Sequence, residues 1–238
     1  MSGPRRRSAL VARLANRPVG STQSAIVDDL RAIILHGEVP PGSAIPVDAV
    51  AGAFGVSRIP VREALMTLIG EGLVDHRPNG GYRVAMMTAR EFGEIYLVRE
   101  ALESAAMRAA VAGATGEDDL LARSALRALD QAIEADDGGA AYHRESRRFH
   151  LALIGPCRMR RLLRMLESAW NMTEPLRPMS HLTGPDRELL HSDHAGMLAA
   201  FLRRDADALG SVCAVHHHRL QAFISALPQH TGLFAEGE

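Results

Sequence analysis

The stretch VSRIPVREAL, from Val56 to Leu65, places two arginines four residues apart with a proline between them. Proline is poorly tolerated inside a helix, but the first turn accepts it because its missing N–H would have no partner there. Ser57 is a natural N-cap residue, so we predict a helix that begins near Arg58. Arg58 and Arg62 then share one face of this helix, opposite its apolar residues.

The segments on both sides of this stretch predict a small mixed domain. Apolar residues at helical spacing predict helices over 22–36 and 47–54, and the helix that begins near residue 58 extends to about residue 71. Glycine or a Pro-Gly turn follows each of them and ends it. Partly alternating residues around the glycine-rich turn at 78–81 predict a hairpin. This order of elements is the outline of a winged helix-turn-helix, which we place at residues 21–87.

The second half of the chain shows no strand pattern. Helical spacing and glycine or proline breaks predict six helices, at about 89–113, 117–136, 139–155, 158–174, 185–204 and 206–227. Helices joined by short links are typical of a bundle. The predicted fold is therefore mainly α, with the winged helix-turn-helix followed by an all-helical bundle over residues 88–230. Residues 1–20 have weak periodicity and a polar composition, which predicts a flexible tail.

Composition limits the class of protein. Hydrophobic residues make up 47% and charged residues 23% of the chain, ordinary values for a soluble globule. No apolar run approaches the roughly 20 residues of a membrane span, and two distant cysteines without metal-binding spacing fit a reduced cytoplasmic setting. The chain has no lysine. Arginines outnumber acidic residues over residues 1–90, and the reverse holds over 91–238, which indicates two parts with different partners.

The two arginines of the opening stretch suit DNA recognition. In a helix-turn-helix, the N-terminal part of the second helix enters the major groove. Arginine there pairs with guanine edges or binds phosphate, and the helix N-terminus also attracts phosphate. The alternative is an ordinary solvated face, with Arg62 bridged to a neighbouring acidic residue.

Residues 24–84 resemble the DNA-binding domain of the GntR family of bacterial transcription regulators. The matching marks, in chain order, are Ile34-Leu-His-Gly-Glu-Val-Pro-Pro-Gly-Ser43, Ile45-Pro46, Gly55-Val-Ser-Arg-Ile-Pro-Val-Arg-Glu-Ala-Leu65, Glu71-Gly-Leu-Val74 and Gly80-Gly-Tyr-Arg-Val84. The resemblance implies DNA contacts from the helix start and from a wing tip in the minor groove: Ser57, Arg58, Pro60, Arg62, Asn79 and Gly80. The chain departs from the pattern at Ala49, where many members carry arginine or lysine.

Residues 89–227 resemble the FCD ligand-binding domain of the FadR-type branch of this family. The marks are Tyr96-Leu-Val-Arg-Glu-Ala-Leu-Glu103, Arg148-Phe-His-Leu-Ala-Leu153, Ser192-Asp-His-Ala-Gly-Met-Leu198, and Asp205 with His216 eleven residues on. The resemblance implies a ligand-responsive regulator, with repression as its mode, that binds a palindromic double-stranded DNA operator as a homodimer. It also implies an effector that carries a carboxylate, such as a small organic acid or a sugar acid.

Three of the eleven histidines fall near the middle of separate predicted helices: His150, His194 and His216. Histidine is a common metal ligand, and convergence of the three inside a bundle is geometrically feasible. The resemblance implies that they bind a divalent transition metal such as Zn, Ni or Mn, together with an aspartate one turn before the first. Here that fourth position is Ser146. Two alternatives remain: a histidine-lined pocket that binds an anion directly, and a helical-bundle metalloenzyme that uses the three histidines and a bound water.

Arg99 is a candidate for effector binding. It lies in mid-helix among apolar residues, where a charge needs a partner. The resemblance places it in the effector pocket, where a guanidinium can hold a carboxylate through two hydrogen bonds, and we expect Tyr96 and Ser146 to line the same pocket. A structural salt bridge to Glu103 or another acid of the bundle is the alternative.

Two further groups are assigned no ligand role. His217 and His218 follow His216 at successive 100° steps around the helix, so the three cannot all face inward; we assign His217 and His218 to a solvated face. Four large side chains are assigned to the core or the pocket wall: Met165, Trp170, Met172 and Met197.

Overall fold

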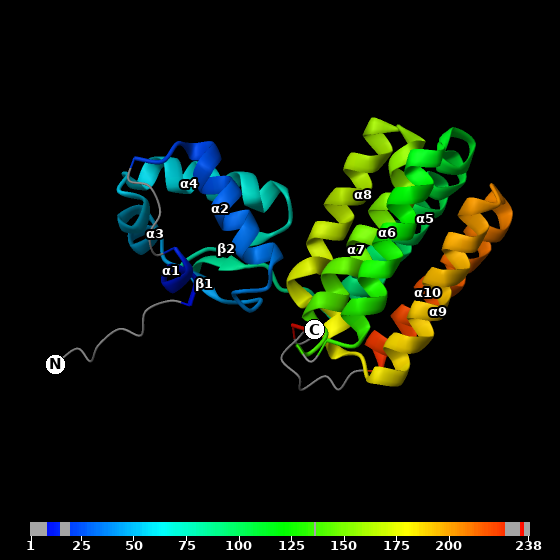
Figure 1. Ribbon diagram of the computed structural model, residues 1–238. Coiled ribbons are helices and arrows are strands. Elements are labelled where there is room, and N and C mark those ends of the chain that lie inside the picture. The colour runs from blue at the N-terminus through cyan, green and yellow to red at the C-terminus, as the bar shows by residue number, and fades with distance from the viewer. Residues whose placement is uncertain (1–8, 15–19, 136, 227–233, 236–238) are drawn as a thin grey trace. The chain divides into compact units, whose positions relative to one another are not determined.

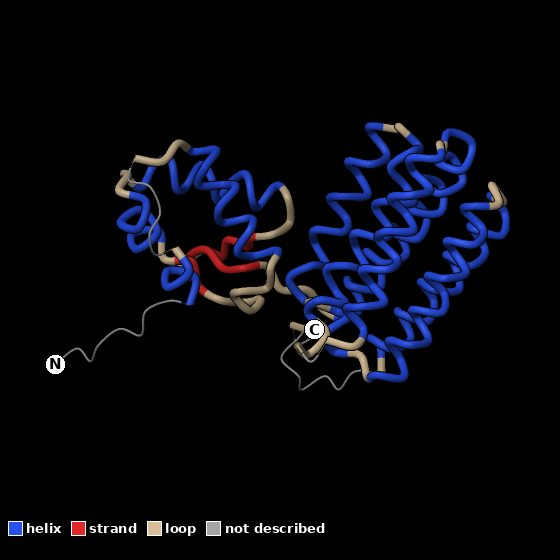
Figure 2. The backbone as a smooth tube through the Cα atoms, in the orientation of Figure 1, coloured by secondary structure: helices blue, strands red, loops and turns tan. Residues whose placement is uncertain are grey.

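The computed structural model describes residues 9–14, 20–135, 137–226 and 234–235 of the 238-residue chain. Its contacts divide the chain into two compact units. The first contains the residues up to Thr88 and two short later segments, and the second begins at Ala89. Among the described residues, strands occur in the first unit alone (Figure 2).

The first unit combines short helices with a small sheet (Figure 1). Its elements are α1 (Ala9–Arg13), α2 (Gln23–Leu35), β1 (Ala44–Ile45), α3 (Val47–Phe54), α4 (Arg58–Gly70), β2 (Val74–Arg77) and β3 (Gly81–Val84). The strands lie in the order β1-β3-β2 and are antiparallel, with Ala44 opposite Arg83 and Val74 opposite Val84. The predicted hairpin is thus part of a three-stranded sheet. β1 was not predicted, because two residues are too few to form an alternating pattern.

One apolar core holds the first unit together. The inner faces of α2 and α4 bury Ile26, Leu30, Val61 and Leu65 almost completely, and each such side chain contributes roughly 1.5 to 3 kcal/mol relative to an exposed position. This core fixes the direction in which α4 presents its other face.

The structure differs from the predicted tail at α1. Leu10 and Leu14 are fully buried in the same core, so the short helix from Ala9 belongs to the folded unit. The two leucines are four residues apart and therefore lie on one helical face. Residues 1–8 and 15–19 of the predicted tail lie outside the described residues.

The chain from Ala89 onward forms the six predicted helices, with ends within a few residues of the predicted ones. They are α5 (Ala89–Gly113), α6 (Gly116–Ile133), α7 (Ala140–Ile154), α8 (Arg160–Thr173), α9 (Gly184–Leu202) and α10 (Ala206–Ser225). Short 3-10 helices lie in the links, at η1 (Gly155–Cys157), η2 (Glu174–Leu176) and η3 (Pro178–His181). Capping boxes at Thr115 and Thr183 start α6 and α9, because each threonine and the aspartate three residues later satisfy one another's backbone N–H groups.

The helices of the second unit pack lengthwise (Figure 1). α10 lies along α5 and α9, α6 lies along α7 and α9, and α5 contacts α7. The inner faces of α5, α7, α9 and α10 thus come together, and these faces carry the candidate site of the second unit. No helix in the described part of the chain has the length and apolar content needed to span a membrane.

Candidate functional site

The first turn of α4 is the candidate site of the first unit. Ser57 occupies the predicted N-cap position with extended backbone, but its side chain makes no capping hydrogen bond. Arg58 and Arg62 are exposed and Pro60 is half-buried, while Val61 packs into the core on the opposite face. The hydroxyl of Ser57 and both guanidinium groups are therefore presented to solvent at a helix N-terminus.

Arg58 forms an ion pair with Asp48 of α3. The two side chains are 65% and 68% exposed, and such surface pairs contribute only about 0 to 1 kcal/mol. Arg58 can therefore exchange this partner for another anion at little cost. The predicted alternative placed a neighbouring acid beside Arg62, whereas the structure places one beside Arg58. Ala49, next to Asp48, is exposed and adds no positive charge.

Asn79 and Gly80 form the exposed tip of the turn between β2 and β3. Asn79 has a φ of 61° and Gly81 a φ of 71°, a left-handed conformation that asparagine and glycine tolerate best. The tip therefore has the residues that its backbone requires. It projects small polar groups from the end of the hairpin.

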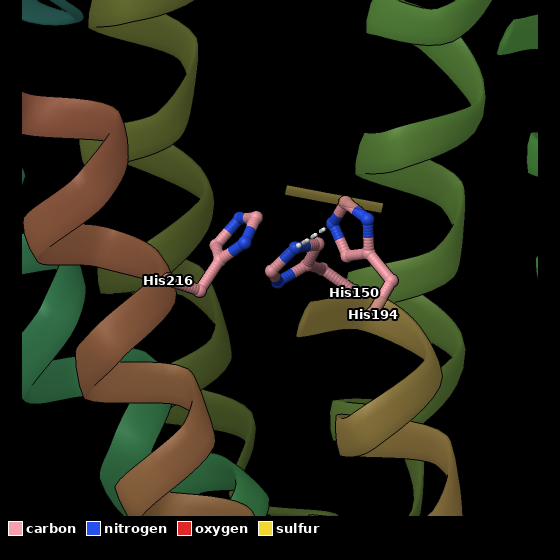
Figure 3. A group of neighbouring side chains, drawn as sticks. All are labelled: His150, His194 and His216. Carbon is pink, nitrogen blue, oxygen red and sulfur yellow. Dashed lines mark hydrogen bonds between the residues drawn. The ribbon is translucent and has the colours of Figure 1, made fainter. Parts of the chain in front are cut away.

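The three predicted histidines converge in the second unit (Figure 3). His150 comes from α7, His194 from α9 and His216 from α10, and all three are buried. One ring nitrogen of each lies within 4.8 Å of the others, and Nε2 of His150 is 3.1 Å from Nε2 of His194. A metal bound at about 2.0 to 2.1 Å by each nitrogen separates its ligand atoms by about 2.9 to 3.4 Å. The His150–His194 spacing fits a shared ion.

Burial keeps two of these rings neutral. It lowers the pKa of His194 well below its usual value, and the neighbouring His216 and His150 lower it further. Burial also lowers the pKa of His216, although Asp193 partly offsets this. Neutral imidazole is the form that binds metal, so the site holds these two ligands in the form that binding requires.

Glu103 of α5 completes the cluster and was missed as a site residue in the sequence. It is fully buried; one carboxylate oxygen contacts Nδ1 of His150, and the other lies 3.0 Å from Nε2 of His217. Burial alone would raise the pKa of this carboxyl, but the charges and hydrogen bonds of the two histidines hold it well below its usual range. Glu103 is thus an ionised acceptor inside the bundle.

The assignment of His217 to a solvated face is wrong. His217 is 2% exposed and lies beside Glu103, and burial lowers its pKa. The physical reason is that α10 packs against both α5 and α9, so two successive residues, His216 and His217, both face protein. His218 is solvated as predicted, with a side chain 70% exposed.

Ser146 is buried on α7 one turn before His150. Among the described residues, the group within 4.8 Å contains the three histidines and no carboxylate. Carboxylates lie behind the rings instead: Glu103 behind His150, and Asp193, whose Oδ2 is 3.6 Å from Nδ1 of His216. Three neutral nitrogen ligands would leave coordination positions open for water or an anion.

Tyr142 and Arg219 contact residues at the edge of the histidine cluster. The hydroxyl of Tyr142 donates to the carbonyl of Arg187 at 3.2 Å and lies 3.5 Å from Nδ1 of His194. Arg219 donates to the other oxygen of Asp193. Neither residue was identified from the sequence, which gives no local sign of contacts between different helices.

Arg99 lies between two aromatic rings. Its guanidinium carbon is 4.5 Å from the ring centres of both Tyr96 and Trp170, and the residue is 4% exposed. Cations are attracted to aromatic faces at this distance. The oxygens of Glu103, the alternative partner of Arg99, contact His150 and His217. The predicted pair Arg99 and Tyr96 therefore lies together, with Trp170 as a third member.

The large side chains assigned to the core or pocket wall divide into two groups. Trp170 and Met197 are buried and Met172 is half-buried. Met165 is 61% exposed, so its assignment is wrong. Helical spacing alone does not define the inner face of an arginine-rich helix such as α8.

Two sequence families match consecutive parts of the chain. The profile described as bacterial regulatory proteins, gntR family, matches residues 22–84, and that of the FCD domain matches residues 94–219. The first match covers α4 and the wing, and the second covers Arg99, Glu103 and the three histidines.

Curated relatives and solved structures agree with these matches. The uncharacterized HTH-type transcriptional regulator BphR of Paraburkholderia xenovorans is 26% identical, over 89% of each chain. The HTH-type transcriptional repressor GlaR of Escherichia coli is 27% identical, over 77% of this chain and 86% of GlaR. The structure of E. coli McbR/YncC has a TM-score of 0.75 at 25% identity, with 86% of this chain and 97% of that chain covered.

Proposed function

Because the chain belongs to the GntR family of bacterial transcription regulators and carries an FCD domain, we propose that it is a homodimeric repressor. In this proposal each subunit reads one half of a palindromic operator through α4 and the wing. A small organic acid or sugar acid, bound in the helical unit, changes the affinity for that operator. Such coupling requires that the effector prefer one arrangement of the protein over the other.

The exposed face of α4 is the observation that carries the DNA-binding proposal. Ser57, Arg58 and Arg62 stand free of the core at a helix N-terminus, the position from which a helix-turn-helix contacts base edges and phosphates. Asn79 and Gly80 at the exposed wing tip suit the narrower minor groove. Repression is supported by GlaR, a relative whose name describes a repressor.

The buried histidines carry the proposal for the helical unit. His150, His194 and His216 would hold a divalent transition metal such as Zn²⁺, Ni²⁺ or Mn²⁺, which would supply positive charge for an anionic effector. Arg99 would hold the carboxylate of the effector through two hydrogen bonds. Tyr96 and Ser146 would line the same space, and the small Ser146 side chain would leave room near His150.

A gel shift tests the regulatory proposal directly. Purified protein is mixed with the DNA upstream of its own gene, with and without a panel of organic acids and sugar acids. We expect a specific shift that at least one acid weakens, and sedimentation should give the mass of a dimer. A specific shift that no acid alters would refute the proposed effector class.

Metal analysis of protein purified without chelators or affinity tags tests the histidine site. We expect about one transition-metal ion per chain if the three histidines act together as a site with an open position. The His194→Ala variant should lose it. Equal metal content in the variant would show that the ion binds elsewhere.

A further inference from the structure

Glu103 is a buried carboxylate that contacts a histidine of the cluster but lies outside the group of converging ligand atoms. An ionised carboxylate only accepts hydrogen bonds. The two nitrogens beside it, Nδ1 of His150 and Nε2 of His217, lie where ring N–H groups donate to a carboxylate. The contacts thus place one hydrogen on each of these two rings.

A histidine that binds a metal is neutral, with one N–H and one lone pair. With Nδ1 of His150 donating to Glu103, the lone pair is on Nε2, the atom that lies 3.1 Å from Nε2 of His194. We propose that Glu103 is a positioning residue that fixes His150 in this tautomer, so that its Nε2 faces the centre of the histidine cluster. The inference deepens the metal-site proposal and rests on it for the effect on metal affinity.

His217 holds the Glu103 carboxylate in one orientation. It holds the second carboxylate oxygen at 3.0 Å, so rotation of the carboxylate away from His150 would break that contact as well. A glutamate held at both oxygens inside a bundle keeps one orientation, and outer partners of this kind fix ligand rings and raise their basicity. His217 thus acts on His150 through Glu103.

The same reasoning about hydrogen positions applies to His194, whose tautomer should depend on whether a metal is bound. Two Nε2 lone pairs cannot face each other at 3.1 Å without a hydrogen or an ion between them. We expect that in metal-free protein Nε2 of His194 carries the hydrogen and donates to His150. A bound metal would need the lone pair of that Nε2, so the hydrogen of a neutral His194 would then be on Nδ1. Tyr142 could accept from that Nδ1, because its own hydrogen goes to the carbonyl of Arg187.

The Glu103→Gln variant tests the positioning role with little change in shape. Its amide offers one acceptor and one donor where the carboxylate offers two acceptors, so both tautomers of His150 become allowed. We expect Zn²⁺ affinity, measured by competition with a chromophoric chelator, to fall roughly 10- to 100-fold, the usual effect of removing an outer partner.

Asp130→Asn is the matched control. Asp130 lies 2.7 Å from Nε2 of His191 in an exposed carboxylate–histidine pair, and neither residue belongs to the converging group. We expect its Zn²⁺ affinity to equal that of the wild type. An equal loss in both variants would overturn the proposal, because the effect would then come from general charge.

Long-range proton–nitrogen correlation spectra of histidine-labelled protein provide a readout that needs no metal. In the wild type we expect His150 to carry its hydrogen on Nδ1 with and without Zn²⁺, while His194 changes tautomer on loading. The Glu103→Gln variant should show a mixture of tautomers at His150. A purely structural role for Glu103 would change the unfolding free energy and leave the tautomer as it was.

The outcomes separate this inference from the metal proposal. One outcome overturns the role of Glu103 alone: the wild type binds Zn²⁺, and Glu103→Gln binds it with equal affinity and keeps the same His150 tautomer. If the wild type binds no Zn²⁺, the metal site is refuted. The spectra then test the role of Glu103 by themselves, and an Nδ1 of His150 without a hydrogen overturns it. If Glu103→Gln does not fold, the wild-type spectra decide: a hydrogen on Nδ1 of His150 is expected, and its absence overturns the inference.

Discussion

The exposed start of α4 and the buried histidine cluster place their key side chains in opposite environments. Arg58 and Arg62 face solvent and need only the start of one helix. His150, His194 and His216 come from three helices and lie inside a bundle. Substitutions at the start of α4 should therefore change DNA binding without changing stability, whereas substitutions in the histidine cluster should change ligand binding and stability together.

The largest expected effect is that of Glu103→Ala on stability. The change leaves two buried histidine nitrogens without their acceptor, and breaking a buried ionic partner typically costs about 3 to 5 kcal/mol. Urea unfolding followed by far-ultraviolet circular dichroism measures it. Glu100→Ala, on the same helix and 3.5 Å from the exposed His218, is the control and should cost less than about 1 kcal/mol. Equal losses would mean that burial is not what distinguishes the cluster.

Arg62→Ala should affect DNA binding and leave stability alone. We expect operator affinity to fall by about 1 to 3 kcal/mol if the side chain contacts a base, with the free energy of unfolding within about 0.5 kcal/mol of the wild type. Arg123→Ala, exposed on α6, should leave operator affinity unchanged. Wild-type affinity in Arg62→Ala would instead support the solvated face.

Acid should destabilise the helical unit through its buried histidines. The pKa values of His194, His216 and His217 are lowered by burial, so the unfolded chain binds more protons. Above the unfolded pKa of 6.5 these histidines are neutral in both states and do not affect the free energy of unfolding. As the pH falls below 6.5, the unfolded chain takes up protons that the folded chain resists, so the free energy of unfolding decreases. The slope reaches at most about 1.4 kcal/mol per pH unit for each histidine.

Urea unfolding at several pH values between about 7.5 and 5.5 measures this slope around the ordinary histidine pKa. His217→Gln should flatten it, whereas His218→Gln, at the exposed neighbouring position, should not. Identical slopes in the two variants would mean that His217 does not resist protonation in the folded state.

Asp48→Ala should have the smallest effect of these variants, and it tests the exposed region by removing an acid instead of an arginine. It removes the exposed partner of Arg58, so the free energy of unfolding should change by less than about 1 kcal/mol. Operator affinity should rise modestly, because a negative charge beside the proposed phosphate contacts is lost. Asp28→Ala, which removes an exposed acid beside Arg31 on α2, serves as the control. Weaker binding in Asp48→Ala would show that Asp48 positions Arg58 for DNA.

Local sequence was enough to predict most helices and the hairpin of this chain. Ser57 and Pro60 mark the start of α4, and glycines and prolines mark most of the helix ends, because caps and breakers act within one turn. The α1 helix and β1 were missed since each is too short for its period to stand out. The family resemblance identified the three histidines, and the bundle brings them together.

Contacts between helices could not be predicted in the same way. Glu103 has no local feature that separates it from the other acids of α5, and its partners are 47 and 114 residues away. His217 was misassigned because the 100° rule describes one helix, whereas α10 is enclosed from two sides. The residues behind the ligands depend on packing, so they became visible only in three dimensions.

Trp170 gives the molecule an optical reporter of its own. It is the one tryptophan of the chain, lies against the guanidinium of Arg99, and meets the ring of His150 edge-on at 5.7 Å between centroids. Indole emission responds to charges and rings this close. An effector that draws Arg99 away, or an ion that binds His150, should change the emission intensity, so both binding events can be followed in unlabelled protein by fluorescence titration.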